Sequence, residues 1–243
     1  NSYRYAGANP NNYVCFGSTA STCPIANLYR IIGVFGDQVK LIKATSATTA
    51  EIGTVAHEVD NWFYWSGSSS NTSNTWSNST LNTNSLNGTY LTNLGIAWTN
   101  KIATTNWQVG GMIMARIKDL NVVQDTYNYE VGSDRKDLIY QAKIGLPYVS
   151  EFGFAADNSC WTTSLYNYEP NGTNWMGNGN HFWTISRVTD VSNEAFNISS
   201  RGFVDGSRIN YGSGHVRPTF NLVSSVRTSG GSGTQLDPYR IEL

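Results

Sequence analysis

The chain has 243 residues, 40% of them hydrophobic and 13% aromatic, which is enough apolar material for a buried core and excludes a disordered tail. Its 16 basic and 17 acidic residues give a formal net charge of −1, so charge gives no reason to expect nucleic acid or an anionic membrane surface as a partner. No apolar run approaches the roughly 18 residues of a membrane helix, and we expect no membrane segment.

The balance of polar residues predicts an exported protein. Charged residues make up 14% of the chain, against about 25% in an average soluble domain. Asn, Ser and Thr are abundant instead, and a surface solvated by amides and hydroxyls is common among exported β-rich proteins. We therefore expect an extracellular, cell-surface location.

We expect one globular domain over residues 1–243. A part led by a β-hairpin covers 1–65, a loop and helical part covers 66–137, and a loop-rich β part covers 138–243.

The three cysteines are spaced unequally. Cys15 and Cys23 flank a short polar stretch, and in an oxidising compartment we expect a disulfide between them. Cys160 could then be a nucleophile or an intermolecular bridge, but no Cys-His signature surrounds it. We interpret it as a buried or unpaired thiol.

The clearest local pattern is a hairpin near the N-terminus. Residues 28–35 and 39–43 are rich in β-branched and aromatic side chains, and Gly36-Asp37 between them predicts a turn. Residues 66–78 contain little to bury and predict an exposed loop. Ser79 can then cap a helix. The apolar stripe of this helix consists of Leu81, Leu86, Tyr90, Leu91 and Leu94.

The last third alternates irregular and extended stretches. Residues 158–181 are rich in Asn, Gly and Trp and predict long loops. An Asp205-Gly206 turn is predicted between two of the strands that follow. The predicted strands cover 182–186, 195–198, 202–206, 208–211, 216–223 and 239–241.

Several of these stretches occur in an order that resembles a known superfamily. The late features are a Trp183 strand, Ala195-Phe196, a hairpin from Gly202 to Arg208, and then 215–218 and 220–222. Their order resembles the C-terminal part of bacterial surface proteins of the C-type-lectin-like superfamily, which includes formylglycine-generating-enzyme-like domains and the variable proteins of diversity-generating retroelements. The stretches 8–14, 29–34, 143–146 and 233–239 look like surface proteins of Gram-positive gut bacteria.

The resemblance implies an α+β, C-type-lectin-like fold, in which antiparallel sheets, a few helices and long irregular loops carry a ligand face on the late loops. Glu169-Pro170-Asn171 matches the triplet that supplies oxygens to calcium and sugar in C-type lectins. Calcium needs six to eight oxygens, and the companion Trp-Asn-Asp triplet is missing, because Thr184-Ile185 follows Trp183. We therefore favour an ordinary proline turn and expect no cofactor, while calcium stays open.

Catalytic patterns are weak. His57-Glu58-Val59-Asp60 lacks the second histidine that a zinc helix needs. His181 and His215 have no nucleophile motif beside them, and no helix follows the glycine-rich stretch 230–233. We expect the chain not to be an enzyme.

Aromatic and amide side chains suit ligand binding, since sugars stack on rings and bond to amides, and protein epitopes use the same residue types. The candidate contact residues along the 166–181 loops are Tyr166, Tyr168, Glu169, Asn171, Trp175, Asn178 and His181. A second candidate set in the late region is Arg201, Arg208, Asn210 and Tyr211.

These observations favour a non-catalytic adhesin-like domain that recognises an extracellular glycan or protein. The alternatives are a pilin-like subunit that self-associates into an extracellular filament and a formylglycine-generating-enzyme-like enzyme.

Overall fold

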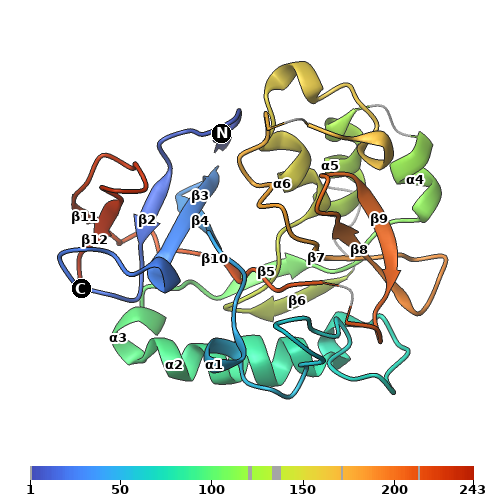
Figure 1. Cartoon of the computed structure of the whole chain (residues 1–243), viewed down its shortest axis with the longest axis horizontal. Coiled ribbons are helices and arrows are strands. Elements are labelled where there is room, and N and C mark those ends of the chain that lie inside the picture. The colour runs from blue at the N-terminus through green and yellow to red at the C-terminus, as the bar shows by residue number, and fades with distance from the viewer. Residues whose placement is uncertain (1, 120–121, 133–137, 171, 213) are drawn as a thin grey trace.

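A computed structural model describes residues 2–119, 122–132, 138–170, 172–212 and 214–243 and has an α+β architecture with three sheets (Figure 1). The largest sheet consists of β1 (Ser2–Arg4), β2 (Tyr13–Cys15), β3 (Leu28–Phe35), β4 (Gln38–Lys43), β10 (Thr219–Asn221), β11 (Thr228–Gly230) and β12 (Tyr239–Ile241). The two smaller sheets pair β5 (Thr105–Gln108) with β6 (Ile139–Ala142), and join β7 (Phe182–Arg187), β8 (Glu194–Ile198) and β9 (Val204–Arg208).

Short helices connect and cover these sheets. They are α1 (Thr49–Ile52), a π-helix (Leu81–Tyr90) continued by α2 (Leu91–Leu94), α3 (Ile96–Thr99), α4 (Met114–Asp119), α5 (Val123–Val131) and α6 (Val149–Phe154). The pairings between the described strands are antiparallel except β12 with β2, which are parallel. This pairing brings the last strand of the chain beside one of the first (Figure 1). No described helix is long and apolar enough to cross a membrane.

The predicted N-terminal hairpin is confirmed. β3 and β4 pair in antiparallel register on either side of the Gly36-Asp37 turn, where Gly36 has a φ of 64°. Their side chains contact two separate core clusters, because successive residues of a strand point to opposite faces. Leu41 lies in a cluster with Trp65, Trp107 and Trp183, whereas Ile42 lies in a cluster with phenylalanines of α6 and β7. The hairpin therefore lies between the two clusters.

Cys15 and Cys23 form a disulfide that closes the loop after β2. Cys160 is a half-buried free thiol whose Sγ lies 3.5 Å from Thr173 Oγ1.

Ser79 acts as the predicted helix cap, since its Oγ accepts a hydrogen bond from the Asn82 N–H. The expectation of an exposed loop over 66–78 is wrong at its C-terminal end. Asn74 is 4% exposed and Trp76 1%. The Asn74 amide donates to the backbone carbonyls of Val188, Val191 and Glu194 and so fixes the loop against the β7–β8 hairpin.

The predicted Asp205-Gly206 turn is also wrong. Residues 204–208 form the single strand β9, and all five residues pair with β8. Pairing along the whole segment outweighs the local turn preference. Gly206 instead permits a close approach, because a Cβ there would lie 2.3 Å from Met114 Cε. The predicted strand 216–223 is reduced to β10, three residues long.

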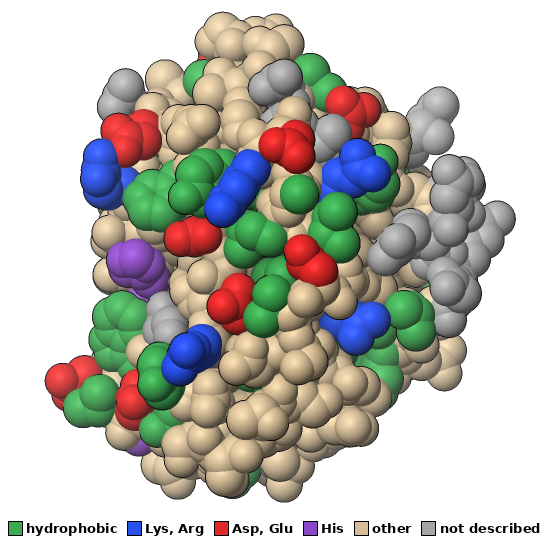
Figure 2. Space-filling model, turned by 90° about the vertical axis from the view of Figure 1, so that its right-hand side faces the viewer, with side chains coloured by type: hydrophobic (Ala, Val, Ile, Leu, Met, Phe, Trp, Pro, Cys, Tyr) green, Lys and Arg blue, Asp and Glu red, His purple; other side chains and the backbone are tan. Residues whose placement is uncertain are grey.

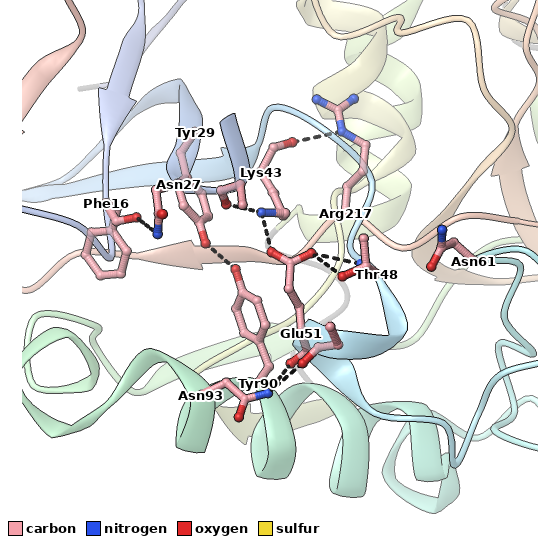
Figure 3. A network of polar contacts seen from close by, with 12 residues as sticks. Phe16, Asn27, Tyr29, Lys43, Thr48, Glu51, Asn61, Tyr90, Asn93 and Arg217 are labelled. Carbon is pink, nitrogen blue, oxygen red and sulfur yellow. Dashed lines mark hydrogen bonds and ion pairs between the residues drawn. The ribbon is translucent and has the colours of Figure 1, made fainter. Parts of the chain in front are cut away.

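A buried polar network joins the hairpin to the helical layer (Figure 3). Lys43, on β4, is fully buried and lies 2.7 Å from the Glu51 carboxylate of α1. The hydroxyls of Tyr29 and Tyr90 bond to each other across the same gap. Burial lowers the pKa of Lys43. Lys43 pairs with Glu51 and Tyr29 pairs with Tyr90, so we interpret these groups as structural.

Candidate functional site

A surface pocket of about 340 Å3 lies between the 169–179 loop and the turn that joins β8 to β9. Backbone forms part of its wall, because four of its lining residues are glycines: Gly172, Gly177, Gly179 and Gly202. The shape depends on Gly202, which has a φ of +100° and would place a Cβ 2.6 Å from Pro170 Cδ. Only glycine adopts this conformation and spacing without strain. The pocket therefore exposes backbone groups, hydroxyls and one ion pair.

The ion pair joins Glu169 and Arg201, which both line the pocket. Their side chains are 47% and 70% exposed. An exposed pair of this kind contributes only about 0–1 kcal/mol to stability. Glu169 and Arg201 can therefore exchange this ion pair for contacts with a ligand, at a small loss of folding free energy.

His181 extends this polar surface. Its Nε2 lies 3.4 Å from the Oγ of Ser200, a pocket residue. The His215 N–H donates to the His181 carbonyl over 2.9 Å, which holds the two histidines side by side. Burial lowers the pKa of His215, and the neighbouring His181 acts in the same direction.

Trp62 completes the surface, and sequence reasoning missed it. Its ring centroid lies 4.8 Å from that of His215 and 6.1 Å from that of His181. Asp60 and Asn61, with φ values of 45° and 63°, precede it. Two consecutive non-glycine residues in the left-handed region are uncommon. The Asp60-Asn61-Trp62 run could have indicated a turn just before Trp62, since Asp and Asn tolerate the left-handed conformation best. We call the pocket together with Trp62, His181 and His215 the late-loop surface.

Two predicted contact residues are core residues instead. Tyr168 is 1% exposed and Trp175 is 4% exposed, and both pack in the cluster around Phe152. The Trp175 Nε1–H donates to the Tyr5 carbonyl over 2.7 Å, and the Arg30 guanidinium lies 4.7 Å from its ring. Proximity in sequence to polar loop residues did not reveal which aromatic side chains point inward.

The remaining candidates fall into separate groups. Tyr166 is half-buried with the Lys118 ammonium 4.9 Å from its ring. Asn178 accepts a hydrogen bond from the Asn180 N–H and does not line the pocket. Asn171 lies outside the described residues.

Arg208, Asn210 and Tyr211 lie at the opposite end of β9 from Arg201, because that strand separates them. Arg208 Nη1 is 3.3 Å from the Tyr211 hydroxyl, and the Asn210 amide donates to the Ser69 carbonyl over 3.1 Å. The second predicted set therefore divides between two places.

The face on the side of α4 and β9 carries charges of both signs, interspersed with hydrophobic and uncharged polar side chains (Figure 2). Among the described residues, no group of three or more His, Cys, Asp or Glu side chains could hold a metal ion. The Glu169 carboxylate, part of the calcium-type triplet, pairs instead with a guanidinium.

Comparison with family models, with curated proteins and with solved structures found no match.

Proposed function

We propose that this chain is a non-catalytic, ligand-binding domain of the cell surface, with a C-type-lectin-like arrangement in which the late loops form the binding face. The observation that carries the proposal is the pocket of about 340 Å3 beside Glu169 and Arg201. Its volume lies within the range of about 300–1,000 Å3 that small-molecule sites occupy.

The chemistry of the late-loop surface supports a polar ligand such as a glycan or a protein loop. The carboxylate of Glu169 accepts hydrogen bonds, the guanidinium of Arg201 donates them, and Ser200 does both. Trp62, which contacts the rings of His181 and His215, adds an aromatic side chain to this surface, and such side chains pack against sugar rings and apolar groups. Both ligand classes, a glycan and a protein loop, stay predictions.

A glycan array probed with and without a chelator tests the proposal. We expect binding that survives the chelator, because Glu169 pairs with Arg201. Arg201→Ala should reduce binding at least tenfold, whereas the matched variant Arg208→Ala, at the far end of β9, should leave it unchanged. A blank array would favour protein recognition, and equal effects of the two variants would refute the pocket as the binding site.

Self-association is the second outcome to measure. The edge strand β11 is exposed along all of its three residues, which offers a short site for strand addition. Sedimentation of the purified chain should show a monomer if it is an adhesin-like domain, and concentration-dependent polymers if it is a filament subunit.

A further inference from the structure

Two Asn-Gly pairs of the described chain lie in opposite surroundings. Asn87-Gly88 is inside the π-helix, whereas Asn178-Gly179 lies in the loop before β7. A third pair includes Asn171, which lies outside the described residues. In an Asn-Gly pair the next backbone nitrogen can approach the asparagine side chain closely, because glycine has no Cβ to obstruct it. The surroundings therefore decide which pair can react.

The Asn87 side chain is held through both of its polar atoms. Its Nδ2 donates to the Asn82 Oδ1 and to the Ile144 carbonyl, each over 2.9 Å, and its Oδ1 accepts the Ile144 N–H over 2.9 Å. Gly88 belongs to the π-helix, in which backbone N–H groups donate to carbonyls of the preceding turn. A ring closed between the Gly88 nitrogen and the Asn87 side chain would break these bonds, so the fold protects this pair.

The Asn178-Gly179 pair has no such restraint. The Gly179 N–H donates to no described residue. Gly179 is exposed and lies outside any helix or strand, and a Cβ there would meet no atom within 4 Å. Neither a hydrogen bond of this N–H to the described chain nor a packed neighbour therefore holds Gly179 in place.

One hydrogen bond of Asn178 favours attack on its side chain. The Asn180 N–H donates to Asn178 Oδ1 over 3.1 Å. When a nitrogen adds to the amide carbon Cγ, negative charge develops on Oδ1, and a donor that is already in place stabilises that charge. This loop therefore combines a free nucleophile with a polarised amide.

We propose that the fold directs spontaneous deamidation to Asn178 and protects Asn87. The Gly179 nitrogen gives its proton to solvent base and attacks Asn178 Cγ. The Nδ2 group then takes up a proton and leaves as ammonia, and a succinimide ring remains. Water opens this ring at either of its carbonyls and leaves aspartate, or isoaspartate, in which the backbone runs through the side chain. Water is the only co-reactant.

The product carries a new negative charge beside the late-loop pocket. Gly177 and Gly179, the neighbours of Asn178 in the chain, both line that pocket. Its charged lining residues are Glu169 and Arg201, which pair with each other. Deamidation therefore adds an unpaired carboxylate to the loop that forms this wall. The modification itself does not depend on the function proposed for the late-loop surface, because it is detected without a ligand.

Peptide mapping by mass spectrometry tests the proposal on the purified chain, sampled over time at mildly alkaline pH. In the folded chain we expect deamidation at Asn178 to be at least about tenfold faster than at Asn87, because the Asn87 bonds must break first. In guanidinium chloride, which removes those bonds, the two rates should become similar. Equal rates in the folded chain, no deamidation at Asn178, or an unchanged ratio after unfolding overturns the proposal.

Two variants of Asn180 test the part played by its backbone N–H. Asn180→Pro removes the donor to Asn178 Oδ1 and should slow deamidation about tenfold. The matched variant Asn180→Gln keeps the backbone N–H and should react as the wild type. Denaturation curves verify that both variants fold. A folded Asn180→Pro variant that deamidates at the wild-type rate overturns the role of this hydrogen bond.

Discussion

Replacing Lys40 by methionine should destabilise the protein strongly. Lys40 Nζ lies 2.5 Å from Glu151 Oε1, and the two side chains are 6% and 7% exposed. In Lys40→Met, Glu151 keeps the Tyr148 N–H on its other oxygen, at 3.0 Å, but Oε1 loses the ammonium. The carboxylate of Glu130 also lies near enough to interact with Lys40, so the substitution leaves two buried acids without this cation.

The burial of the Lys40–Glu151 pair determines how much stability Lys40→Met should lose. Removing one partner of a buried ion pair costs about 3–5 kcal/mol, because the other charge stays buried without compensation. An exposed pair contributes about 0–1 kcal/mol. The Lys40–Glu151 pair belongs to the first class. A loss of about 3–5 kcal/mol is a large part of the stability of a typical domain, which is about 5–15 kcal/mol.

Urea denaturation followed by circular dichroism measures the loss. The double variant Lys40→Met/Glu151→Gln should recover much of it, because a neutral amide carries no buried charge. Arg201→Met, which breaks the exposed pair with Glu169, is the matched control and should lose less than about 1 kcal/mol. The reasoning is refuted if Lys40→Met loses no more than this control, or if the double variant is no more stable than the single one.

Three further predictions concern other parts of the chain. Replacing Cys15 and Cys23 by serine opens a disulfide loop with a sequence separation of 8 and should cost about 2–3 kcal/mol in the chain-entropy picture, measured by denaturation. Gly202→Ala should cost about 1–3 kcal/mol and abolish late-loop binding on the array, because φ is +100° and Pro170 stands in the way. The lowered pKa of His215 means that the unfolded chain holds more protons between the folded pKa and 6.5. Unfolding free energy should therefore rise with pH in that window, and a His215→Asn variant that keeps the same slope would contradict this.

Local patterns in the sequence determined the elements that depend on neighbouring residues. The hairpin over 28–43 followed from two β-rich runs about Gly36-Asp37, and both strands lie where the pattern placed them. The short spacing of Cys15 and Cys23, together with the expected oxidising compartment, indicated the disulfide that closes this loop. These features need only contacts between residues close in the chain, so composition and order were sufficient.

Tertiary contacts decided the site. Tyr168 and Trp175 share the composition of a binding loop but are buried, because both pack in the cluster around Phe152. Asp205-Gly206 reads as a turn but is held extended by β8. A pocket between β5 and the large sheet is lined by both Gln108 and Asn221, which are more than a hundred residues apart in the chain. The sequence pattern does not predict that these two residues lie close together, because the packing of separate sheets brings them there.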